Sequence, residues 1–433
     1  YKRQAQDETP SRKLFTNVNV FDGFAYELAM NTDVLVEGNV IVEVGQDISA
    51  PDATVIDGGG RTLMPGLIDM HTHVTFETEQ GTNGFNFYDF GGAGAMADQA
   101  LRDKVLLEGI AAGRDIAGNA RGIARLIQLG QLSGPRLDTD GGVLSATGGH
   151  GDWGGPTDTA LNMDYGAMVE QSYIVDGRDD VIEASRRNFR NGAHFTKIMA
   201  GGGVASLYDP LEIYAATQEE VEAAVEIASE YGTYVAIHAY NNQSYTRSLD
   251  AGVRSFEHGF LVSEDIVKRM AKMDQDIAWS FQCYMSVATF GDYDSMPEFF
   301  THEQKLKGVA VGEGARNAAA MMLKHDVFMV GGSDMFSPAY GPRMKEDITC
   351  RVNMVDYPAA HALKMSTGNA GIVLKWSKVL DPYPTYHIGR IAPDSYADIL
   401  LWDGNPLENI DLILDESKLH LVMKDGVIYK DIM

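Results

Sequence analysis

Short alternations of apolar and polar residues mark both ends of the chain. From residue 13 to residue 62 they form the runs KLFTNVNVFDG, DVLVEGNVIVEVG and ATVIDGGG, which are broken by Gly, Asn and Asp. The C-terminal residues repeat the pattern in ADILLWDGNP and HLVMKDGVIYKD. A period of two with Asp-Gly turns is typical of β-hairpins. We predict one small β-sandwich domain built from residues 13–62 and 385–433, with residues 1–12 as a disordered or extended lead.

The middle of the chain, residues 63–384, alternates apolar strands with helical patterns. In the clearest helix, TQEEVEAAVEIASEYG, Thr217 and Glu220 fit a capping box, and Gly232 ends the pattern. A second helix is predicted from Ser263 in SEDIVKRMAKM. Eight segments have the pattern of strands: PGLIDMHTH, GIAAGRDIAG, GPRLDTDGG, FTKIMAGGG, YVAIHAYN, SFEHGFL, IAWSFQCYM and VFMVGGSDM. This α/β order predicts a (β/α)8 TIM barrel, whose active site lies at the C-terminal ends of the strands.

Composition limits the classes of partner. The chain has 35 basic and 61 acidic residues and a formal charge of −26, which disfavours nucleic acid and anionic membranes as partners. No apolar run approaches the roughly 18 residues of a membrane span. The two cysteines, Cys283 and Cys350, imply no disulfide framework and leave the compartment open. The polar start at Tyr1 fits either a removed export signal or a trimmed N-terminus, and we favour a periplasmic or secreted location over a cytoplasmic one.

Several histidines and one aspartate occupy the ends of predicted barrel strands. His71 and His73 are two residues apart on one strand, so both side chains point to the same face. His238, His258 and Asp334 end three other strands. A His-x-His pair alone is more often incidental, and His238 or His258 alone would fit a hydrogen-bonded core histidine. Together at one rim they predict a site for zinc or a similar divalent ion.

Lys197 stands inside the apolar strand FTKIMAGGG. Lysine is almost never buried without a partner, and an ammonium group cannot bind a metal. After reaction with CO2 the amine becomes a carbamate, an anion that can bridge two cations. The alternative is a lysine whose stem follows the strand and whose amine reaches solvent.

The ordered set His-x-His, Lys, His, His, Asp, with LMPGLIDMHTH and the split β-rich ends, resembles the amidohydrolase superfamily over nearly the whole chain. TGGHGD, FTKIMAGGG, HAY and EHG resemble its metal-dependent branch of Xaa-Pro and carboxypeptidase-type dipeptidases and ochratoxin amidase. The resemblance implies two divalent ions, with zinc the first choice, and a carboxylated Lys197 that bridges them. It places His71, His73 and Asp334 on one ion and His238 and His258 on the other.

Two further residues are predicted to contact substrate. His150 stands among glycines in GGHGDWGG, which allow its ring to approach a ligand closely. Tyr240 lies two residues after His238 and shares its strand face, although a rim tyrosine without a role is an equal alternative. Deaminases of the superfamily place Glu three residues after the fifth-strand histidine, where this chain has Asn241. That difference counts against a mononuclear deaminase.

We therefore predict a binuclear amide hydrolase that acts on a peptide or N-acyl amino acid bond. A metal-activated hydroxide would attack the carbonyl, Asp334 would transfer the proton, and His150 or Tyr240 would help to stabilise the oxyanion. A cyclic-amide or lactone hydrolase of the same superfamily is the alternative, and a non-catalytic homologue is a weaker one. We expect a small-molecule substrate and a homo-oligomer.

Overall fold

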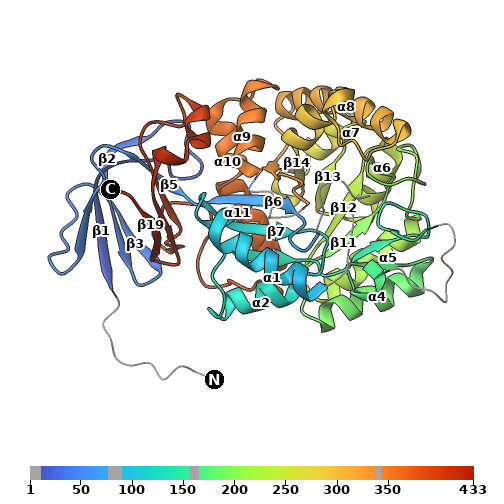
Figure 1. The fold of residues 1–433 in the computed structure, drawn as a ribbon, viewed down its shortest axis with the longest axis horizontal. Helices are drawn as coiled ribbons and strands as arrows, with labels where there is room; N and C mark the ends of the chain where they lie inside the picture. The colour runs from blue at the N-terminus through green and yellow to red at the C-terminus, as the bar shows by residue number, and fades with distance from the viewer. Residues whose placement is uncertain (1–10, 77–89, 156–164, 337–342) are drawn as a thin grey trace.

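Strands from both ends of the chain share one sheet in the computed structural model, which describes residues 11–76, 90–155, 165–336 and 343–433. The strands are β1 (Arg12–Val20), β2 (Ala29–Glu37), β3 (Val40–Gly45), β4 (Thr54–Asp57), β5 (Thr62–Pro65), β16 (Ser395–Tyr396), β17 (Ile399–Trp402), β18 (Leu419–Lys424) and β19 (Val427–Asp431). Their order is β16-β3-β2-β1-β5-β17-β18-β19, with β4 paired to β1 in a nine-stranded mixed sheet. This sheet forms one end of the elongated molecule (Figure 1).

The shared sheet agrees with the predicted β-rich ends in its strands but not in its layers. The strands form one continuous sheet, so a two-layer sandwich is not confirmed. The β18–β19 hairpin turns at Asp425 and Gly426, which have φ angles of 54° and 73°, as the Asp-Gly pattern predicts. Strand β1 begins at Arg12, and residues 1–10 of the predicted lead lie outside the described residues.

The middle of the chain contains two parallel sheets. Their strands are β6 (Leu67–Thr72), β7 (Ile110–Asp115), β8 (Arg136–Thr139), β9 (Val143–Ser145), β10 (Ser172–Ile174), β11 (Thr196–Met199), β12 (Val235–Ala239), β13 (Ser255–His258), β14 (Ala278–Phe281) and β15 (Met329–Gly331). One sheet has the order β10-β9-β11-β12-β13-β14-β15 and the other β6-β7-β8.

All eight predicted strands are present, and β9 and β10 are additional. The two sheets meet where Thr72 bridges Met335, but in the described part of the chain their ladders do not close into one barrel. The closed TIM barrel is therefore not confirmed, whereas the α/β architecture with parallel strands is.

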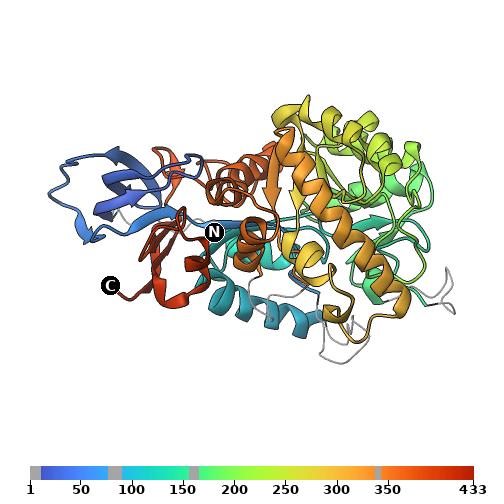
Figure 2. The same cartoon turned by 90° about the horizontal axis from the view of Figure 1, so that it is seen from above.

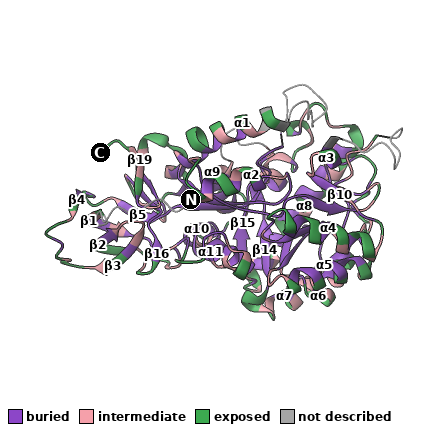
Figure 3. Ribbon diagram, turned by 90° about the horizontal axis from the view of Figure 1, so that it is seen from below, coloured by how far each residue is buried: buried purple, intermediate pink, exposed green. Residues whose placement is uncertain are grey.

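Helices pack along the outside of the parallel strands (Figures 2 and 3). They are α1 (Phe90–Ala100), α2 (Arg121–Gln128), α3 (Tyr165–Met168), α4 (Arg178–Arg190), α5 (Gln218–Glu230), α6 (Asn242–Ala251), α7 (Glu264–Ala271), α8 (His302–Lys324), α9 (Met344–Asn353), α10 (Ala359–Met365) and α11 (Gly368–Leu374). The predicted capping box of Thr217 and Glu220 begins α5, and α7 follows Ser263 as predicted. Among the described helices, none combines the length and apolarity that a bilayer crossing requires.

The main apolar core lies between the seven-stranded sheet and the helices that cover it. Ile198 and Ile237 come from β11 and β12, Val221 and Ile227 from α5, and Val311 from α8, and all are buried. Figure 3 shows the same division, with buried strands inside and exposed helix faces outside. This packing holds the C-terminal ends of the parallel strands in fixed positions.

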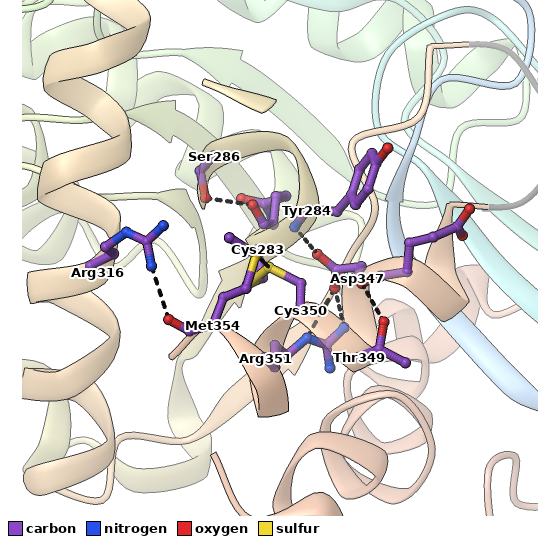
Figure 4. Close-up of a disulfide and its surroundings, with 11 residues drawn as sticks. Cys283, Tyr284, Ser286, Arg316, Asp347, Thr349, Cys350, Arg351 and Met354 are labelled. Carbon is purple, nitrogen blue, oxygen red and sulfur yellow. Dashed lines mark hydrogen bonds and ion pairs between the residues drawn. A yellow bond between two sulfur atoms is a disulfide. The ribbon is translucent and has the colours of Figure 1, made fainter. Parts of the chain in front are cut away.

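A disulfide joins Cys283 and Cys350, which are 67 residues apart in the sequence (Figure 4). Cys283 precedes the π-helical segment η3 (Tyr284–Thr289), and Cys350 lies in α9. Beside it, the backbone N–H of Tyr284 donates to Asp347 Oδ1 at 2.9 Å. The two cysteines alone predicted no such link, because their pairing depends on how distant segments pack.

Candidate active site

The eight residues predicted for the site line one small cavity of about 40 Å³. They are His71, His73, His150, Lys197, His238, Tyr240, His258 and Asp334. The parallel strands explain this convergence: Lys197 lies within β11, and the other seven residues lie in the C-terminal part of a strand or in the segment that follows one. The cavity is thus at the strand ends where α/β proteins build their sites.

Three of these side chains form a cluster of possible metal ligands. His71, His73 and Asp334 each offer one donor atom, and the three atoms lie within 4.8 Å of one another. Asp334 Oδ1 lies 3.1 Å from His73 Nε2 and 3.4 Å from His71 Nε2. The Asp334 backbone N–H donates to the His71 carbonyl at 2.8 Å, which fixes the end of β15 beside β6. Two imidazoles and a carboxylate fit a divalent first-row ion.

The backbone around this cluster is close-packed and locally strained. Asp334 has a φ of 56°, a left-handed conformation that costs energy for a residue with a side chain. A Cβ atom on Gly332 would lie only 2.4 Å from Cβ of His71, so this position requires glycine. The protein therefore maintains an unfavourable backbone conformation to hold Asp334 against the two histidines.

The protonation states of the cluster suit a metal. Burial lowers the pKa of His71 to about 4, so its ring is neutral at pH 7 and keeps a lone pair for a ligand. Burial alone would raise the pKa of Asp334, but the attraction of His71, whose ring is charged only at acidic pH, and the hydrogen bond with His73 lower it below its ordinary value. Metal binding requires neutral imidazole and ionised carboxylate, the states that these pKa shifts favour for His71 and Asp334.

His238 and His258 form a second pair beside the first cluster. Their ring centroids are 4.5 Å apart, and the His258 ring lies 5.0 Å from that of His71. Burial lowers the pKa of both rings well below the ordinary value, so both are neutral. His238 Nε2 lies 3.1 Å from the carbonyl oxygen of Gly202, which leaves Nδ1 for a ligand. Among the described residues, no Asp or Glu joins this pair in a three-donor cluster.

Lys197 lines the same cavity as these two groups and is 1% exposed. The alternative of an amine that reaches solvent does not agree with this burial. Within the described ranges, no carboxylate lies within ion-pair distance of the amine; Glu257, Asp140 and Asp334 act on it only from farther away. Burial lowers the pKa of Lys197 to about 8, which gives the amine a reactive neutral form near pH 7. A carbamate formed there would supply the anion that His238 and His258 lack.

His150 lies against the second pair through its ring. It stacks on His238 with centroids 4.1 Å apart, and its Nδ1 lies 2.6 Å from Ser206 Oγ and 3.6 Å from Asp209 Oδ2. A Cβ atom on Gly203 would lie 1.9 Å from His150 Nδ1, so the ring occupies space that only glycine leaves. Because Nδ1 has these partners, Nε2 is the ring nitrogen that remains for a ligand.

Tyr240 is buried in the wall of the same cavity and is 3% exposed. Its ring centroid lies 5.1 Å from that of His238 and 5.3 Å from that of His258. This position differs from that of a rim tyrosine and agrees with the predicted inward direction.

The sequence prediction missed a buried network behind His71. Glu257 accepts hydrogen bonds from His71 Nδ1 at 2.8 Å, Arg114 Nη2 at 2.6 Å and Ser255 Oγ at 2.7 Å. Partners of this kind fix the tautomer of a metal-binding histidine and direct its other nitrogen to the metal. The available signal was a charged residue inside an apolar strand, in SFEHG and in IAAGRDIAG.

Comparison with known proteins agrees with this geometry. The model of the amidohydrolase family matches residues 62–429. The chain belongs to the amidohydrolase family. An ochratoxinase from Aspergillus niger is 26% identical to this amidohydrolase over 422 residues, which cover 92% of this chain and 83% of the ochratoxinase.

Solved structures extend the likeness over the whole fold. A prolidase in complex with N-methylphosphonate-L-proline has a TM-score of 0.83 and 28% identity, with 98% of this chain and 100% of the prolidase covered. A Xaa-Pro dipeptidase with methionine in its active site has a TM-score of 0.83 and 25% identity, with 97% and 100% covered. This amidohydrolase is accordingly a hydrolase that acts on amide or peptide bonds.

Proposed function

We propose that this amidohydrolase cleaves a dipeptide or an N-acyl amino acid with the help of two divalent metal ions. The observation that carries the proposal is that four histidines, Asp334 and Lys197 line one cavity, and that the buried Lys197 has no ion-pair partner among the described residues. We further infer that the two parallel sheets are parts of a (β/α)8 barrel, with the cavity at its C-terminal mouth.

We assign each residue to an ion as the family resemblance implies. His71, His73 and Asp334 would hold one ion, His238 and His258 the other, and carboxylated Lys197 would bridge them. Imidazole and carboxylate donors in a buried site suit zinc. When bound, such ions polarise a substrate carbonyl and lower the pKa of water toward neutrality.

The protein groups would carry out the proton transfer and bind the substrate. Asp334 contacts the histidines through Oδ1, so Oδ2 would accept the proton of the attacking water and pass it to the leaving amine. His150 Nε2 and the Tyr240 hydroxyl would donate hydrogen bonds to the carbonyl oxygen or to the carboxylate of the substrate. These contacts would hold the scissile bond beside Asp334.

The relatives support a linear substrate with a carboxylate near the amide. Proteins named prolidase, Xaa-Pro dipeptidase and ochratoxinase are similar to this chain over most of its length. At a formal charge of −26 the protein repels anions at long range, so such a carboxylate requires donors inside the cavity. His150 and Tyr240 are the two donors already placed there.

A panel assay tests this function. The zinc-loaded protein should hydrolyse dipeptides and N-acyl amino acids, and conversion of the substrate carboxylate to its amide should cost about 1.5–3 kcal/mol in kcat/KM. Tyr240→Phe should reduce that difference between acid and amide. Ring opening of cyclic amides or lactones without cleavage of any linear amide would replace this proposal with the alternative.

Two accompanying proposals concern the setting of the enzyme. The Cys283–Cys350 disulfide supports a periplasmic or secreted location, because disulfides persist in oxidising compartments. A homo-oligomer remains a prediction, which analytical ultracentrifugation of the zinc-loaded protein would test.

A further inference from the structure

A large apolar pocket adjoins the small cavity that the candidate metal ligands line, which we call the metal cavity. It has a volume of about 590 Å³, within the range of small-molecule sites. We call it the aromatic pocket; its apolar lining residues are Trp153, Ala205, Leu207, Tyr208, Met285, Phe290, Pro297, Phe299, Phe300 and Phe336. Trp153, Ala205, Phe290 and Phe336 also line the metal cavity, so the two spaces share a wall. A molecule bound among the candidate metal ligands would therefore lie beside this pocket.

The charged groups of the aromatic pocket already have partners. Asp152 accepts backbone N–H groups of Gly148 at 2.7 Å and Gly154 at 3.0 Å. Arg343 Nη1 lies 3.2 Å from Glu346 Oε1, and its guanidinium lies 5.5 Å from the ring centroid of Tyr284. An anionic ligand group would lose its hydration among the apolar lining residues without gaining a free counter-ion, because Arg343 already pairs with Glu346, so the lining favours an uncharged group over an anionic one.

Both sides of the aromatic pocket are cross-linked to the rest of the fold. On one side, Lys307 Nζ donates to the carbonyl oxygens of Gly203, Ser206 and Asp209 at 2.7, 2.9 and 3.0 Å. On the other side, the disulfide joins the start of η3, which contributes Met285, to α9. A pocket held in this way keeps its shape before the ligand arrives, which reduces the entropy cost of binding.

We propose that the aromatic pocket selects substrates with an uncharged aromatic or bulky aliphatic group attached next to the scissile amide. This inference rests on the proposed function, since it assigns the substrate class of the same site. Leu207 and Phe299 line the pocket and are 58% and 40% exposed overall, and a bound apolar group would cover part of this surface. The transfer of apolar surface from water supplies the driving force.

A matched substrate series tests the selection. In the first series, one amino acid is acylated with acetyl, isobutyryl, phenylacetyl, naphthylacetyl or succinyl groups. In the second series, the acyl group is kept as acetyl, and the side chain of the amino acid varies over the same range of size and charge. In one of the two series, kcat/KM should be at least about tenfold higher for the substrates with an aromatic group than for the substrate with a methyl group. It should be low again for the substrate that carries an extra carboxylate. Equal kcat/KM across both series would overturn the inference and leave the proposed amide hydrolysis intact.

Variants separate the pocket from the catalytic centre. Leu207→Asp and Thr289→Trp, which charge and fill the pocket, should remove the preference for aromatic groups while N-acetyl substrates react as in the wild type. Leu306→Asp is the matched control, because Leu306 is 51% exposed and does not line the pocket. An aromatic preference that survives in both pocket variants, at unchanged melting temperature, would refute the assignment.

A binding measurement makes the test independent of turnover. Naphthylacetamide should bind the wild type and Leu306→Asp with the same affinity in calorimetry, and at least about tenfold more weakly to Leu207→Asp. If no amide is cleaved but this difference appears, the proposed function fails and the pocket assignment stands. Equal affinity in all three proteins would contradict the assignment.

Discussion

Nδ1 of His71 donates a hydrogen bond to Oε2 of Glu257 across 2.8 Å, and both side chains are closed to solvent. Burial alone would raise the pKa of Glu257, but the charge of Arg114 and the hydrogen bond of His71 lower it below its ordinary value. Glu257 therefore remains an anion that fixes the His71 ring with Nε2 toward Asp334. The orientation of one candidate ligand is thus set by a residue outside the cavity.

Replacement of Glu257 by Gln should weaken metal binding without removing a ligand. The neutral amide cannot hold the His71 tautomer as firmly, and loss of such a partner typically costs 10–100-fold in metal affinity. Zinc titration against a competing chelator measures the change. Glu264→Gln, at a surface ion pair with Lys324, is the control and should bind zinc as the wild type does. Unchanged affinity in Glu257→Gln would show that packing alone orients His71.

Lys197→Ala should lose most activity and bound metal, because it removes the proposed bridging carbamate. Short carboxylic acids such as formate or propionate should restore part of the activity by occupying the same space as anions. Lys424→Ala is the matched control: burial also lowers the pKa of Lys424 to about 8, but this lysine lies in β18 of the shared sheet. If the short acids restore neither the activity nor the metal content of Lys197→Ala, the result would argue against a carbamate.

Asp334→Asn should keep much of the metal but lose turnover. An amide cannot accept the proton of the attacking water, and general acid–base groups contribute at least about 10²-fold to the rate. The loss should appear in kcat, measured together with metal content. Asp326→Asn is the control, because Asp326 precedes β15 whereas Asp334 follows it. This variant should react at the wild-type rate. Near-normal turnover in Asp334→Asn would require another base.

Asp138 should make the protein less stable as the pH rises. Burial, followed by the charge of Asp381, raises the pKa of Asp138 to about 8 in the folded protein, against an ordinary value of 3.8. Between these values the folded protein holds a proton that the unfolded chain releases. The free energy of unfolding contributed by this group therefore falls with rising pH, by up to about 1.4 kcal/mol per pH unit.

Asp138→Asn removes this dependence because the amide cannot ionise. Relative to the wild type, its free energy of unfolding should increase steadily from pH 5 to pH 8 in urea denaturation. Asp265→Asn is the control, since Asp265 is 95% exposed and should show no such divergence. Parallel stability curves for Asp138→Asn and the wild type would mean that Asp138 is ionised in the folded protein.

Loss of the disulfide should destabilise the protein substantially. The Cys283–Cys350 link closes a 67-residue segment, for which chain entropy predicts about 4 kcal/mol of stabilisation at 25 °C. Urea denaturation of the wild type with and without dithiothreitol measures the effect. The double variant Cys283→Ala/Cys350→Ala should be as unstable as the reduced wild type. Its stability should be the same with and without dithiothreitol. A wild type that unfolds at the same urea concentration in both conditions would contradict this expectation.

The elements of this fold were predictable where the determining interactions are local. The Thr217–Glu220 capping box, the Asp425-Gly426 turn and all eight strands of the parallel sheets follow from residues close in sequence. The separation of the strands into two sheets and the addition of β9 and β10 do not, because pairing between distant strands depends on packing. For the same reason Cys283 and Cys350 carry no sign of their pairing in the sequence.

The candidate site was predictable because its residues are polar interruptions at the ends of apolar strands. All eight predicted side chains line one cavity. Glu257 and Arg114 also interrupt apolar strands, but sequence does not say which partner each one meets. The aromatic pocket was missed because its lining comes from separate loops and short helices, where apolar residues follow no period.

The shared sheet also sets an order of events during protein synthesis. Strand β5 is paired to β1 on one side and to β17 on the other, where Leu63 meets Leu401. While the ribosome translates the residues between them, one edge of β5 has no partner and can pair with a strand of another nascent chain. The interval between the synthesis of β5 and that of β17 is therefore the period in which this edge can pair with the wrong strand.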